Sequence, residues 1–505
     1  MLATVRSATI LGVEGRPVTV EVHVADGLPG FTMVGLPDAM CREARDRARA
    51  AVQNTDGVDW PPKKVTVNLA PSSERKVGTG LDLAIALGYL AATGKVPPPA
   101  LDDLAVVGEL GLDGSLRPVP GTLALVDAVE AKRVLVPTAA HHEASLVERV
   151  EVVTASTLGE VIEALRGAPW PDPPPDPPPV ARPPEPDLAD VRGQPVARLA
   201  VEVAAAGAHH LLLVGAPGAG KTMLARRLPG LLPDLTPDEA MVATRAHSAA
   251  GVGIPGGLVS RPPFRAPHHS ATMVALVGGG TAALRPGELS LSAGGVLFLD
   301  ELGEFPPVVV DALRQPLEEG VVRVSRARAS TVLPARFLLV AATNPCPCGD
   351  ADQPGRCRCS EAARARYRRR LSGPVLDRFD LRVGVARPDV SSLLAAEAGE
   401  PSAPVAERVA RARAIAASRG VRANADIPAG RLDELTPLTS GAQRALEGAL
   451  EHGRLTARGL ARVRRVARTL ADLDGVDPAA PLSVEVVALA MTLRDGGGRH
   501  LESVA

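Results

Sequence analysis

The sequence predicts an α/β protein of several folded units, and three observations carry that prediction. Residues 1 to about 167 mix period-two strands such as RPVTVEVHV with helical stretches such as LDLAIALGYLAATG. In the second part an apolar strand, HHLLLVG, runs through a Gly-rich turn into a helix. From about Ala403 onward the sequence is mostly amphipathic helix rich in Arg and Ala. We therefore expect an N-terminal α/β domain, a core with a parallel sheet and a C-terminal helical domain.

The boundaries between these units follow from chain length and proline content. A chain of 505 residues is too long for one ordinary domain. The segment APWPDPPPDPPPVARPPEPD, Ala168 to Asp187, favours extended polyproline II because proline removes backbone donors. We therefore predict an N-terminal domain over residues 1–168, a semi-rigid linker over 169–187, a core over 188–388 and a helical domain over 389–505.

Composition excludes several classes of function. The formal net charge of −1 rules out a globally basic protein, although a local basic channel lining would not show in that total. Aromatic residues make up 2% of the chain, so Arg contacts to phosphate are favoured over base stacking. The N-terminus lacks the apolar region of a signal peptide, and no apolar run is long enough to span a membrane. We expect a cytoplasmic protein with no membrane partner.

The Gly-rich turn GAPGAGKT matches G-x-x-x-x-G-K-[ST] between a predicted strand and a predicted helix. Glycines let backbone N–H groups close around phosphates, Lys221 reaches the outer phosphates, and Thr222 offers its hydroxyl to Mg²⁺. A chance Gly-rich turn is disfavoured because both flanking elements are present. The predicted nucleotide-binding residues are Gly215, Ala216, Pro217, Gly218, Ala219, Gly220, Lys221 and Thr222.

Two further apolar strands end in polar residues. GGVLFLDEL ends in Asp300 and Glu301, and we expect Asp300 to hold the Mg²⁺ shell while Glu301 orients and activates the attacking water. Such an acidic pair is also a common strand end, but its pairing with Lys221 favours catalysis. FLLVAATN ends in Asn344, whose side chain could steer the same water. The sequence thus predicts ATP and Mg²⁺ as cofactors.

Four of the five cysteines lie in CPCGDADQPGRCRC, as two C-x-C pairs. Cys346, Cys348, Cys357 and Cys359 could complete a closed tetrahedral Zn²⁺ site that stabilises a loop too small to have a core. C-x-C is less usual than C-x-x-C, so reduced thiols or a redox switch is the alternative to structural zinc. Cys41 lies on a predicted amphipathic helix and is interpreted as a small core residue.

Two insertions could contact nucleic acid. The segment EEGVVRVSRARASTVLPARF predicts two strands with a basic tip at Arg326 and Arg328, for which a plain solvated hairpin is the alternative. The segment RPPFRAPHHSATMVALVGGGTAALRPGELS is expected to be a Gly-rich loop. Its His268 and His269 lack the spacing of helical metal ligands and have no close carboxylate in the sequence. We therefore expect a structural or pore role for them.

Taken together, GAPGAGKT, LFLDE, AATN and SGPVLDRFD resemble the AAA+ ATPases that include magnesium chelatase motor subunits and MCM helicases. The resemblance is strongest to the magnesium-chelatase-like YifB/ComM family, on motifs spread over nearly the whole chain. These include GLPDAMCREARDRARAAV, VNLAP, DLADVRGQ, FRAPHHSAT, GELSLSAGGVLFLDELGEF and TARGLARVRRVARTLADL. The resemblance implies an AAA+ P-loop core, a C-terminal lid and a homo-oligomeric ring, a hexamer.

The same resemblance implies roles for several arginines. Arg378 of LDRFD is similar to the arginine finger that enters a neighbouring subunit's site, with a surface ion pair as the alternative. Arg458 of TARGLARV resembles the lid arginine called sensor two, and Arg462 and Arg465 are alternatives on a similar helix face. By resemblance to MCM-like proteins, Arg326 would lie on a hairpin that grips the DNA backbone in the ring's pore.

The first domain resembles the Lon protease domain, an S5-like α/β fold, and the Lon-like domain of RadA, on VVGELGLDGSLRPVPGTLALVDAVEAKRVLVP. Lon proteolysis needs a Ser nucleophile activated by a Lys. The corresponding stretch, RKVGTGLDLAIALG, offers Thr79 and Gly80 instead, and no lysine occurs between Lys95 and Lys132. We expect a non-proteolytic scaffold or DNA contact.

The leading functional hypothesis is an ATP-hydrolysing, ring-forming DNA motor. By resemblance to ComM it would be a helicase that promotes branch migration when incoming DNA recombines during natural transformation, in competent cells. Its partner would be single-stranded or branched DNA bound without sequence preference. The alternative is an ATP-driven remodeller of a protein partner, as in magnesium chelatase.

Overall fold

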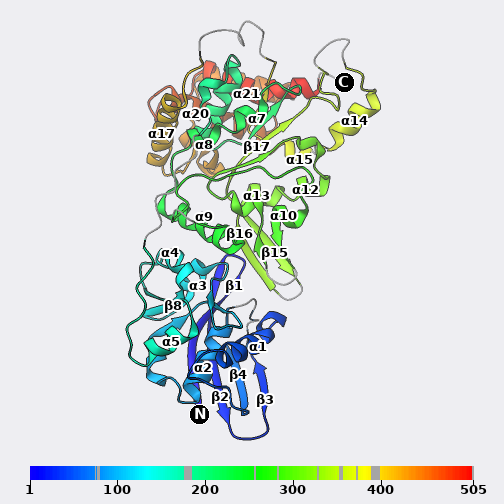
Figure 1. The fold of residues 1–505 in the computed structure, drawn as a ribbon. Helices are drawn as coiled ribbons and strands as arrows, with labels where there is room; N and C mark the ends of the chain where they lie inside the picture. The colour runs from blue at the N-terminus through cyan, green and yellow to red at the C-terminus, as the bar shows by residue number, and fades with distance from the viewer. Residues whose placement is uncertain are drawn as a thin grey trace.

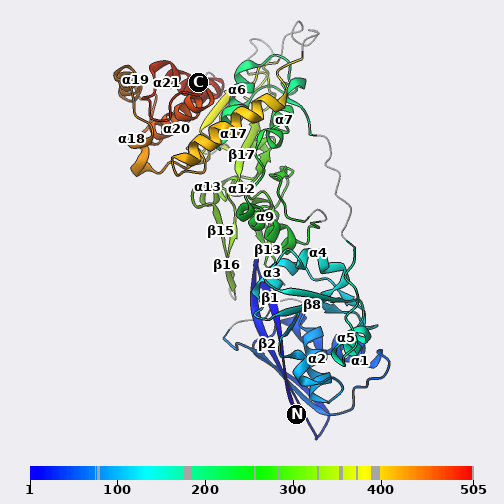
Figure 2. The ribbon, with the colours of Figure 1, turned by 90° about the vertical axis from the view of Figure 1, so that its left-hand side faces the viewer.

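The computed structural model describes residues 1–73, 76, 80–175, 185–254, 257–280, 284–326, 329–351, 357–370, 373–387 and 398–502. The predicted α/β architecture is confirmed. A mixed-sheet domain stands at one end of an elongated molecule, and a parallel-sheet core with a C-terminal group of helices stands at the other (Figures 1 and 2). Among the described residues, no helix combines the length and apolar character needed to cross a bilayer.

The N-terminal domain is built on a seven-stranded sheet. In sheet order its strands are β3 (Gly30–Val34), β4 (Lys64–Ala70), β2 (Glu14–Ala25), β1 (Leu2–Leu11), β5 (Leu104–Val106), β8 (Arg133–Pro137) and β9 (Glu151–Ala155). Its helices are α1 (Ala39–Gln53), α2 (Asp82–Ala92), α3 (Thr122–Ala128), α4 (His141–Ala144) and α5 (Leu158–Leu165). The alternation in β2 places Val18, Val20, Val22 and Val24 in the core, and Cys41 of α1 is buried as expected.

The core contains a five-stranded sheet in which every neighbouring pair is parallel. Its order is β11 (Phe264–Arg265), β14 (Val296–Leu299), β17 (Leu338–Thr343), β10 (Leu211–Val214) and β18 (Leu381–Gly384). All residues of β10, β14 and β17 are buried, which explains their continuous apolar sequences. The surrounding helices are α6 (Pro195–Gly207), α7 (Lys221–Ala225), α8 (Leu228–Leu231), α9 (Pro237–Ala250), α10 (Met273–Val277), α11 (Glu288–Leu291), α12 (Pro307–Asp311), α13 (Arg314–Glu319), α14 (Glu361–Arg370) and α15 (Gly373–Leu376).

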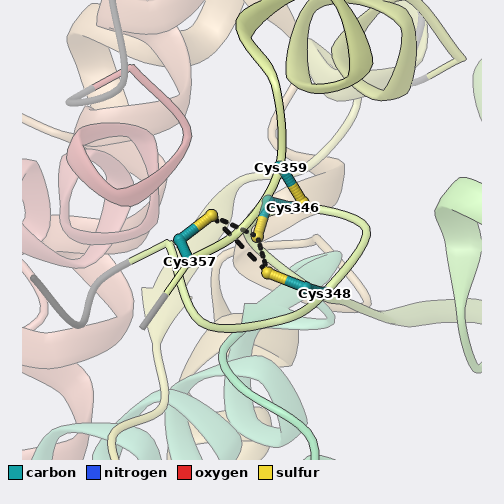
Figure 3. A group of neighbouring side chains, drawn as sticks. All are labelled: Cys346, Cys348, Cys357 and Cys359. Carbon is teal, nitrogen blue, oxygen red and sulfur yellow. Dashed lines mark hydrogen bonds between the residues drawn. The ribbon is translucent and has the colours of Figure 1, made fainter. Parts of the chain in front are cut away.

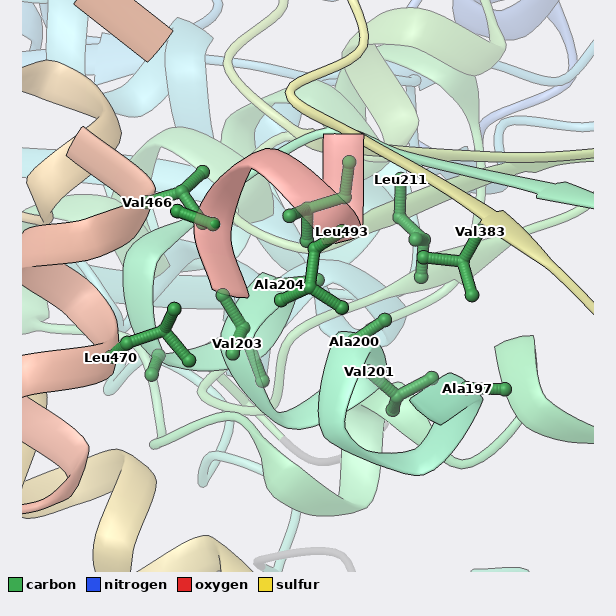
Figure 4. Packing of buried hydrophobic residues seen from close by; sticks show 14 of the residues in the cluster. Ala197, Ala200, Val201, Val203, Ala204, Leu211, Val383, Val466, Leu470 and Leu493 are labelled. Carbon is green, nitrogen blue, oxygen red and sulfur yellow. The ribbon is translucent and has the colours of Figure 1, made fainter. Parts of the chain in front are cut away.

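The C-terminal helices share one apolar cluster with the core. They are α17 (Ser402–Ser418), α18 (Leu432–Leu435), α19 (Ser440–Glu451), α20 (Ala457–Leu473) and α21 (Val484–Glu502). Figure 4 shows α6 at the centre of this cluster, with Val203 and Ala204 near Val466 and Leu470 of α20 and Leu493 of α21. Because α6 also packs against β10 and β18, the helical domain is fastened to the parallel sheet.

The segment predicted to be a Gly-rich loop is more ordered than expected. It contains α10, α11 and the strand pair β12 (Gly278–Gly279) with β13 (Arg285–Pro286). Its Leu276 and Leu289 are buried in the core, so apolar residues at these points outweigh the local glycine content. The prediction of a loop over this whole segment was therefore wrong.

The two predicted strands that follow α13 form a hairpin, β15 (Val321–Arg326) with β16 (Ala329–Pro334). The hairpin reaches toward the turn between β1 and β2 (Figure 2). There a Cβ on Gly12 would lie 2.8 Å from Leu333, and Thr331 donates to the Leu11 carbonyl at 3.4 Å. Val13 belongs to the same apolar cluster as Leu333. The hairpin therefore has the N-terminal domain as a packing partner.

A buried polar network joins the helical domain to the core at Asp380, just before β18. Its carboxylate accepts from the backbone N–H of His210 at 3.0 Å and pairs with Arg462 of α20 at 2.5 Å. Burial by itself raises the pKa of Asp380, but Arg462 and His209 beside it bring that pKa well below the ordinary value. The charged carboxylate therefore stabilises the junction.

We predict that Asp380→Asn lowers the free energy of unfolding at pH 7 by about 3 kcal/mol, because Arg462 would keep a buried guanidinium without its counter-charge. A folded-state pKa below the unfolded value means that wild-type stability is lost as pH falls below about 4. The variant should lose less over that window. Chemical denaturation at pH 7 and at a pH below about 4 measures the free energy of unfolding of both proteins. The exposed Asp377→Asn is the control. Equal stability of wild type and Asp380→Asn at pH 7 would contradict the prediction.

Candidate nucleotide-binding site

The Gly-rich turn leaves the carboxyl end of β10 and leads directly into α7. Gly215 passes so close to β18 that a Cβ would lie 2.2 Å from the Val385 carbonyl oxygen. Gly218 and Gly220 have φ values of +75° and +92°, which other residues rarely adopt. The predicted turn therefore forms because glycine stands where the backbone path requires it, and the resulting loop is a cradle suited to phosphate.

Lys221 is buried at the centre of this loop. Its ammonium donates to the carbonyls of Gly215 at 2.6 Å and Ala216 at 3.0 Å and to Asn344 Oδ1 at 3.1 Å. Burial lowers the pKa of Lys221, whereas Asp300 and Glu301 act in the opposite direction. The structure thus brings the predicted Lys221 and Asn344 together from segments 123 residues apart.

Thr222 and Asp300 also meet. Thr222 Oγ1 donates to Asp300 Oδ2 at 2.7 Å, so a hydroxyl and a carboxylate oxygen lie side by side next to Lys221. Oxygen donors of these two kinds are those that Mg²⁺ accepts while also binding phosphates. The residues present therefore fit a Mg²⁺–nucleotide complex, held by Thr222 and Asp300.

Glu301 adopts a left-handed backbone conformation, with φ of +53°. Such a conformation is uncommon for a residue with a Cβ and costs about 1–2 kcal/mol. Its carboxylate is half exposed and lies 3.2 Å from His269 Nδ1. The strained turn after β14 thus directs Glu301 to a position beside the phosphate loop where it can meet water.

Sequence reasoning missed the contact of His269 with this site. The sequence gives His269 no close carboxylate, and it lies 32 residues before Glu301. Its ring packs edge-on near Phe305, which follows the same turn as Glu301. His269 and Glu301 meet because the segment that carries His269 approaches the end of β14.

Gln194 is a second residue that the sequence did not reveal. Its side-chain amide donates to the carbonyls of Ala219 at 2.7 Å and Ala386 at 3.2 Å. It therefore ties the phosphate loop to the end of β18 from the residue that precedes α6. An isolated Gln before a helix carries no sequence signal of this role.

Arg378 lies at the other end of the sheet from the phosphate loop. It precedes β18, whereas the loop follows the parallel strand β10, so a strand length of about 13 Å separates the two ends. Its side chain pairs with Glu318 of α13, and its backbone carbonyl accepts from Arg462 at 2.8 Å. The predicted finger and the phosphate loop of one chain are therefore not brought together.

The three candidate lid arginines, Arg458, Arg462 and Arg465, occupy different environments. A cavity of about 270 Å³ opens between the sheet and the helical domain, and it is lined by Arg378, Arg462 and Arg465. Arg465 donates to the Ile427 carbonyl at 2.6 Å, and burial lowers its pKa. Arg458 stands exposed in the first turn of α20, outside that cavity.

The four clustered cysteines form a compact group of free thiols (Figure 3). Cys346 Sγ lies 3.3 Å from Cys348 Sγ and 3.7 Å from Cys357 Sγ, and all four sulfur atoms lie within 4.8 Å of one another. Burial opposes ionisation of Cys348, but the backbone N–H of Asp350 and the neighbouring thiols lower its pKa to about 6. Four such ligands could bind zinc.

Several predicted residues lie outside what the structure describes. Arg328 and Thr79 belong to the residues that are not described, and for Arg326 only the backbone is. Arg326 ends β15 opposite Ala329, so its position at the tip of the hairpin follows from the register.

The fold and the site together define a P-loop nucleotide-binding protein of the AAA+ class. The phosphate loop, the Thr222–Asp300 pair and Asn344 lie at the carboxyl ends of three adjacent parallel strands, β10, β14 and β17. This class implies ATPase chemistry with ATP and Mg²⁺.

Comparison with known proteins places the chain within this class. Three protein-family models match the chain. "Magnesium chelatase, subunit ChlI" matches residues 187–393, "Subunit ChlI of Mg-chelatase" matches 20–140, and "Magnesium chelatase, subunit ChlI C-terminal" matches 399–494. "Uncharacterized protein YifB" of Escherichia coli is 43% identical over 479 residues, 94% of each chain. "Competence protein ComM" of Haemophilus influenzae is 43% identical over 484 residues, also 94% of each. The chain belongs to the magnesium chelatase ChlI-like family and is a homologue of YifB and ComM.

A more distant similarity concerns part of the chain. "Probable DNA helicase MCM9" of Arabidopsis thaliana is 27% identical over 175 residues, which cover 35% of this chain and 22% of that protein.

We predict that Lys221→Ala weakens ATP binding about 100-fold, because a charge-assisted contact to phosphate is worth about 2–3 kcal/mol. Titration of a fluorescent ATP analogue measures the affinity. Lys132→Ala is the matched control, since Lys132 is exposed in the N-terminal domain and pairs with Asp103 at 3.0 Å. Unchanged affinity in Lys221→Ala would exclude the loop as the phosphate site.

Proposed function

We propose that this protein is an ATP-hydrolysing, ring-forming DNA motor that promotes branch migration or unwinding when incoming DNA recombines during natural transformation. The observation that carries the proposal is that Lys221, Asn344 and the Thr222–Asp300 pair meet at one end of the core sheet, whereas Arg378 lies at the other end. Such an arrangement makes turnover depend on a neighbouring subunit, as a ring requires.

In the proposed reaction each residue has a separate task. The phosphate loop and Lys221 hold the phosphates of ATP, while Thr222 and Asp300 hold Mg²⁺, which neutralises charge on those phosphates when bound. Glu301 orients the attacking water and accepts its proton, and Asn344 fixes the position of that water. His269, 3.2 Å from Glu301, keeps the carboxylate in place.

Arg378 is proposed to act on the nucleotide of an adjacent subunit in a hexamer. Its guanidinium would stabilise charge developing on the γ-phosphate. Arg378 Nε is buried with no hydrogen-bond partner among the described residues, and its neighbours Arg462 and Arg465 add positive charge to the same cavity. We propose that the lid arginines Arg462 and Arg465 act from this cavity. Arg458, the candidate for sensor two by sequence, is proposed as a further lid arginine.

Support for DNA as the partner comes from relatives and from the hairpin. One homologue is named a competence protein, and the protein that matches 175 residues of the chain is named a probable DNA helicase. The β15–β16 hairpin carries Arg326 at its end, and Arg328 follows two residues later in the sequence, so six copies around a ring would offer a basic lining to single-stranded or branched DNA. Binding through phosphates is independent of sequence and weakens with salt. We place this activity in the cytoplasm.

The N-terminal domain is proposed to be a non-proteolytic scaffold with a Lon-like fold, or a DNA contact. The packing of its Gly12 turn against Leu333 of the hairpin supports a role in positioning that hairpin. A linker over 169–187, a core over 188–388 and a lid over 389–505 complete the proposed division.

The second candidate function is remodelling of a protein partner, as for magnesium chelatase. The family models favour it, since all three are described as parts of the magnesium chelatase subunit ChlI. DNA dependence of turnover separates the two candidates.

We predict that Arg378→Ala and Glu301→Gln each bind ATP but hydrolyse it at least about 100-fold more slowly. When the two variants are co-expressed with different tags and purified as mixed rings, turnover should rise well above the sum of the separate activities. An interface that combines an intact Glu301 with an intact Arg378 from the neighbour becomes competent.

The matched control mixes Glu301→Gln with Lys221→Ala. Both changes damage the same nucleotide site, so no interface regains a full set and turnover should stay low. Recovery in the control, or its absence in the test mixture, would refute action of Arg378 in trans. Normal turnover by Glu301→Gln alone would overturn its assignment as the base.

We predict that single-stranded and forked DNA stimulate ATP hydrolysis by the wild type, and that the stimulation falls as salt rises. Arg326→Ala should reduce it at every salt concentration. Arg323→Ala is the control, because Arg323 lies on the same strand but pairs with Glu319 at 3.2 Å. ATP turnover that DNA does not alter would discard the DNA motor and favour the protein remodeller.

A further inference from the structure

We propose that Cys346, Cys348, Cys357 and Cys359 bind one structural Zn²⁺, and that this metal fixes the loops around the phosphate site so that its loss weakens nucleotide binding. The coupling rests on the proposed function, namely ATP binding at residues 215–222. The metal site itself does not.

The spacing of the sulfur atoms fits a tetrahedral ion. With Zn–S bonds of about 2.3 Å, the sulfur atoms of a tetrahedral site lie about 3.8 Å apart. The contacts among Cys346, Cys348 and Cys357 are 3.3, 3.5 and 3.7 Å, and no pair of the four exceeds 4.8 Å. Four thiolates leave no position for water, which makes the site structural.

The surroundings offset the negative charge that four thiolates around Zn²⁺ would carry. Arg364 Nη2 donates to Cys357 Sγ at 3.1 Å, an outer contact of the kind that orients metal ligands. Cys359 lies just before α14, whose first turn is capped by Ser360 Oγ accepting from the Ala363 N–H at 3.2 Å. The second cysteine pair therefore leads directly into the capped first turn of α14.

The first link to the nucleotide site is direct contact with the phosphate loop. Gly349 follows Cys348 with φ of +83°, and a Cβ on it would lie 2.2 Å from Pro217 Cδ. Next to it, Asp350 is 3.7 Å from Arg387, which donates to the Pro217 carbonyl at 3.3 Å. The turn made by the first cysteine pair thus supports the outer side of the phosphate loop.

The second link is covalent. Cys346 is two residues after Asn344 and is buried, with 1% of its surface exposed. A metal bound by Cys346 would fix the chain immediately beyond the residue that contacts Lys221 at 3.1 Å.

The third link runs through α14, which follows the second cysteine pair. Tyr367 of α14 contacts Thr343 Oγ1 at 3.1 Å, and its ring fills the space beside Gly303, where a Cβ would lie 2.7 Å away. Arg370 pairs with Glu304 at 3.0 Å. Because Gly303 and Glu304 belong to the turn after Glu301, α14 supports the carboxylate side of the site.

One metal would therefore connect three supports: the phosphate loop, the strand end with Asn344, and the turn with Glu301. Without it, the two cysteine pairs are joined only by thiol contacts, and the loop regains the conformational freedom that a cross-link removes. We expect the metal-free protein to remain folded, since the core clusters do not depend on these residues, but to bind nucleotide more weakly.

The first experiment measures metal in the purified full-length protein. About one Zn²⁺ per chain is expected by elemental analysis, and replacement by Co²⁺ should give the visible absorption of a tetrahedral cobalt–thiolate complex. Cys348→Ser with Cys357→Ser should abolish both signals, while Cys41→Ala, which removes the remote fifth cysteine, should keep them. Protein purified under reducing conditions that holds no zinc and gives no cobalt–thiolate spectrum would overturn the metal site, and a disulfide found in protein purified without reductant would then assign a redox switch.

The second experiment measures affinity for a fluorescent ATP analogue before and after zinc removal by a chelator. Affinity should fall about tenfold or more and return when zinc is restored. Gly349→Ala should keep the metal yet weaken binding of the nucleotide, because its Cβ would displace Pro217. Circular dichroism verifies that each sample is folded.

The outcomes separate the two proposals. Zinc that is present but can be removed without changing nucleotide affinity would overturn the coupling and leave the ATP site intact. Failure of the zinc-loaded protein to bind the nucleotide at all would overturn the proposed ATPase, and the coupling with it, whereas the zinc content and cobalt spectrum would still decide the cysteine site.

Discussion

The position of β17 between β10 and β14 is the constraint on which the rest of the site depends. The register pairs Val214 with Thr343, and the Gly215 N–H donates to the Thr343 carbonyl at 3.2 Å. Asn344 is thereby delivered to Lys221, while β14 on the other side delivers Asp300 to Thr222. Parallel strands end at the same edge of a sheet, so three short apolar strands are enough to assemble residues from distant segments.

The two ends of this sheet have different electrostatic characters. At the carboxyl ends, one buried ammonium faces carboxylates and an amide. At the amino ends, Arg378, Arg462 and Arg465 line one cavity. There Glu318 pairs with Arg378, and the buried Asp380 pairs with Arg462. The proposed phosphate site therefore lies at one end of the sheet, and the arginine proposed to act on a neighbour lies at the other, which is the arrangement that the proposed ring requires.

Residues outside the catalytic set support it from three directions. Gln194 holds the phosphate loop to the end of β18, the cysteine turn supports it at Pro217, and α14 supports the turn that follows Glu301. On the far side of the core, Leu333 of the hairpin and Val13 of the N-terminal domain share one apolar cluster with Leu299 of β14. Motion of the hairpin would therefore involve both the N-terminal domain and the strand that carries Asp300.

The sequence by itself determined the elements and the chemical types at the site. Three features of the sequence identify the phosphate loop, Asp300, Glu301 and Asn344. They are the continuous apolar strands, the glycines at fixed positions and Lys221, which is the only lysine after Lys132. Only the tertiary structure decided that His269 meets Glu301, that Arg378 stands a strand length from its own phosphate loop, and that Gly349 touches Pro217. It also decided that residues 261–290 hold helices, because the burial of Leu276 and Leu289 outweighs local propensity. These contacts join segments far apart in the chain, and sheet order and packing, which set them, leave no periodic pattern in the sequence.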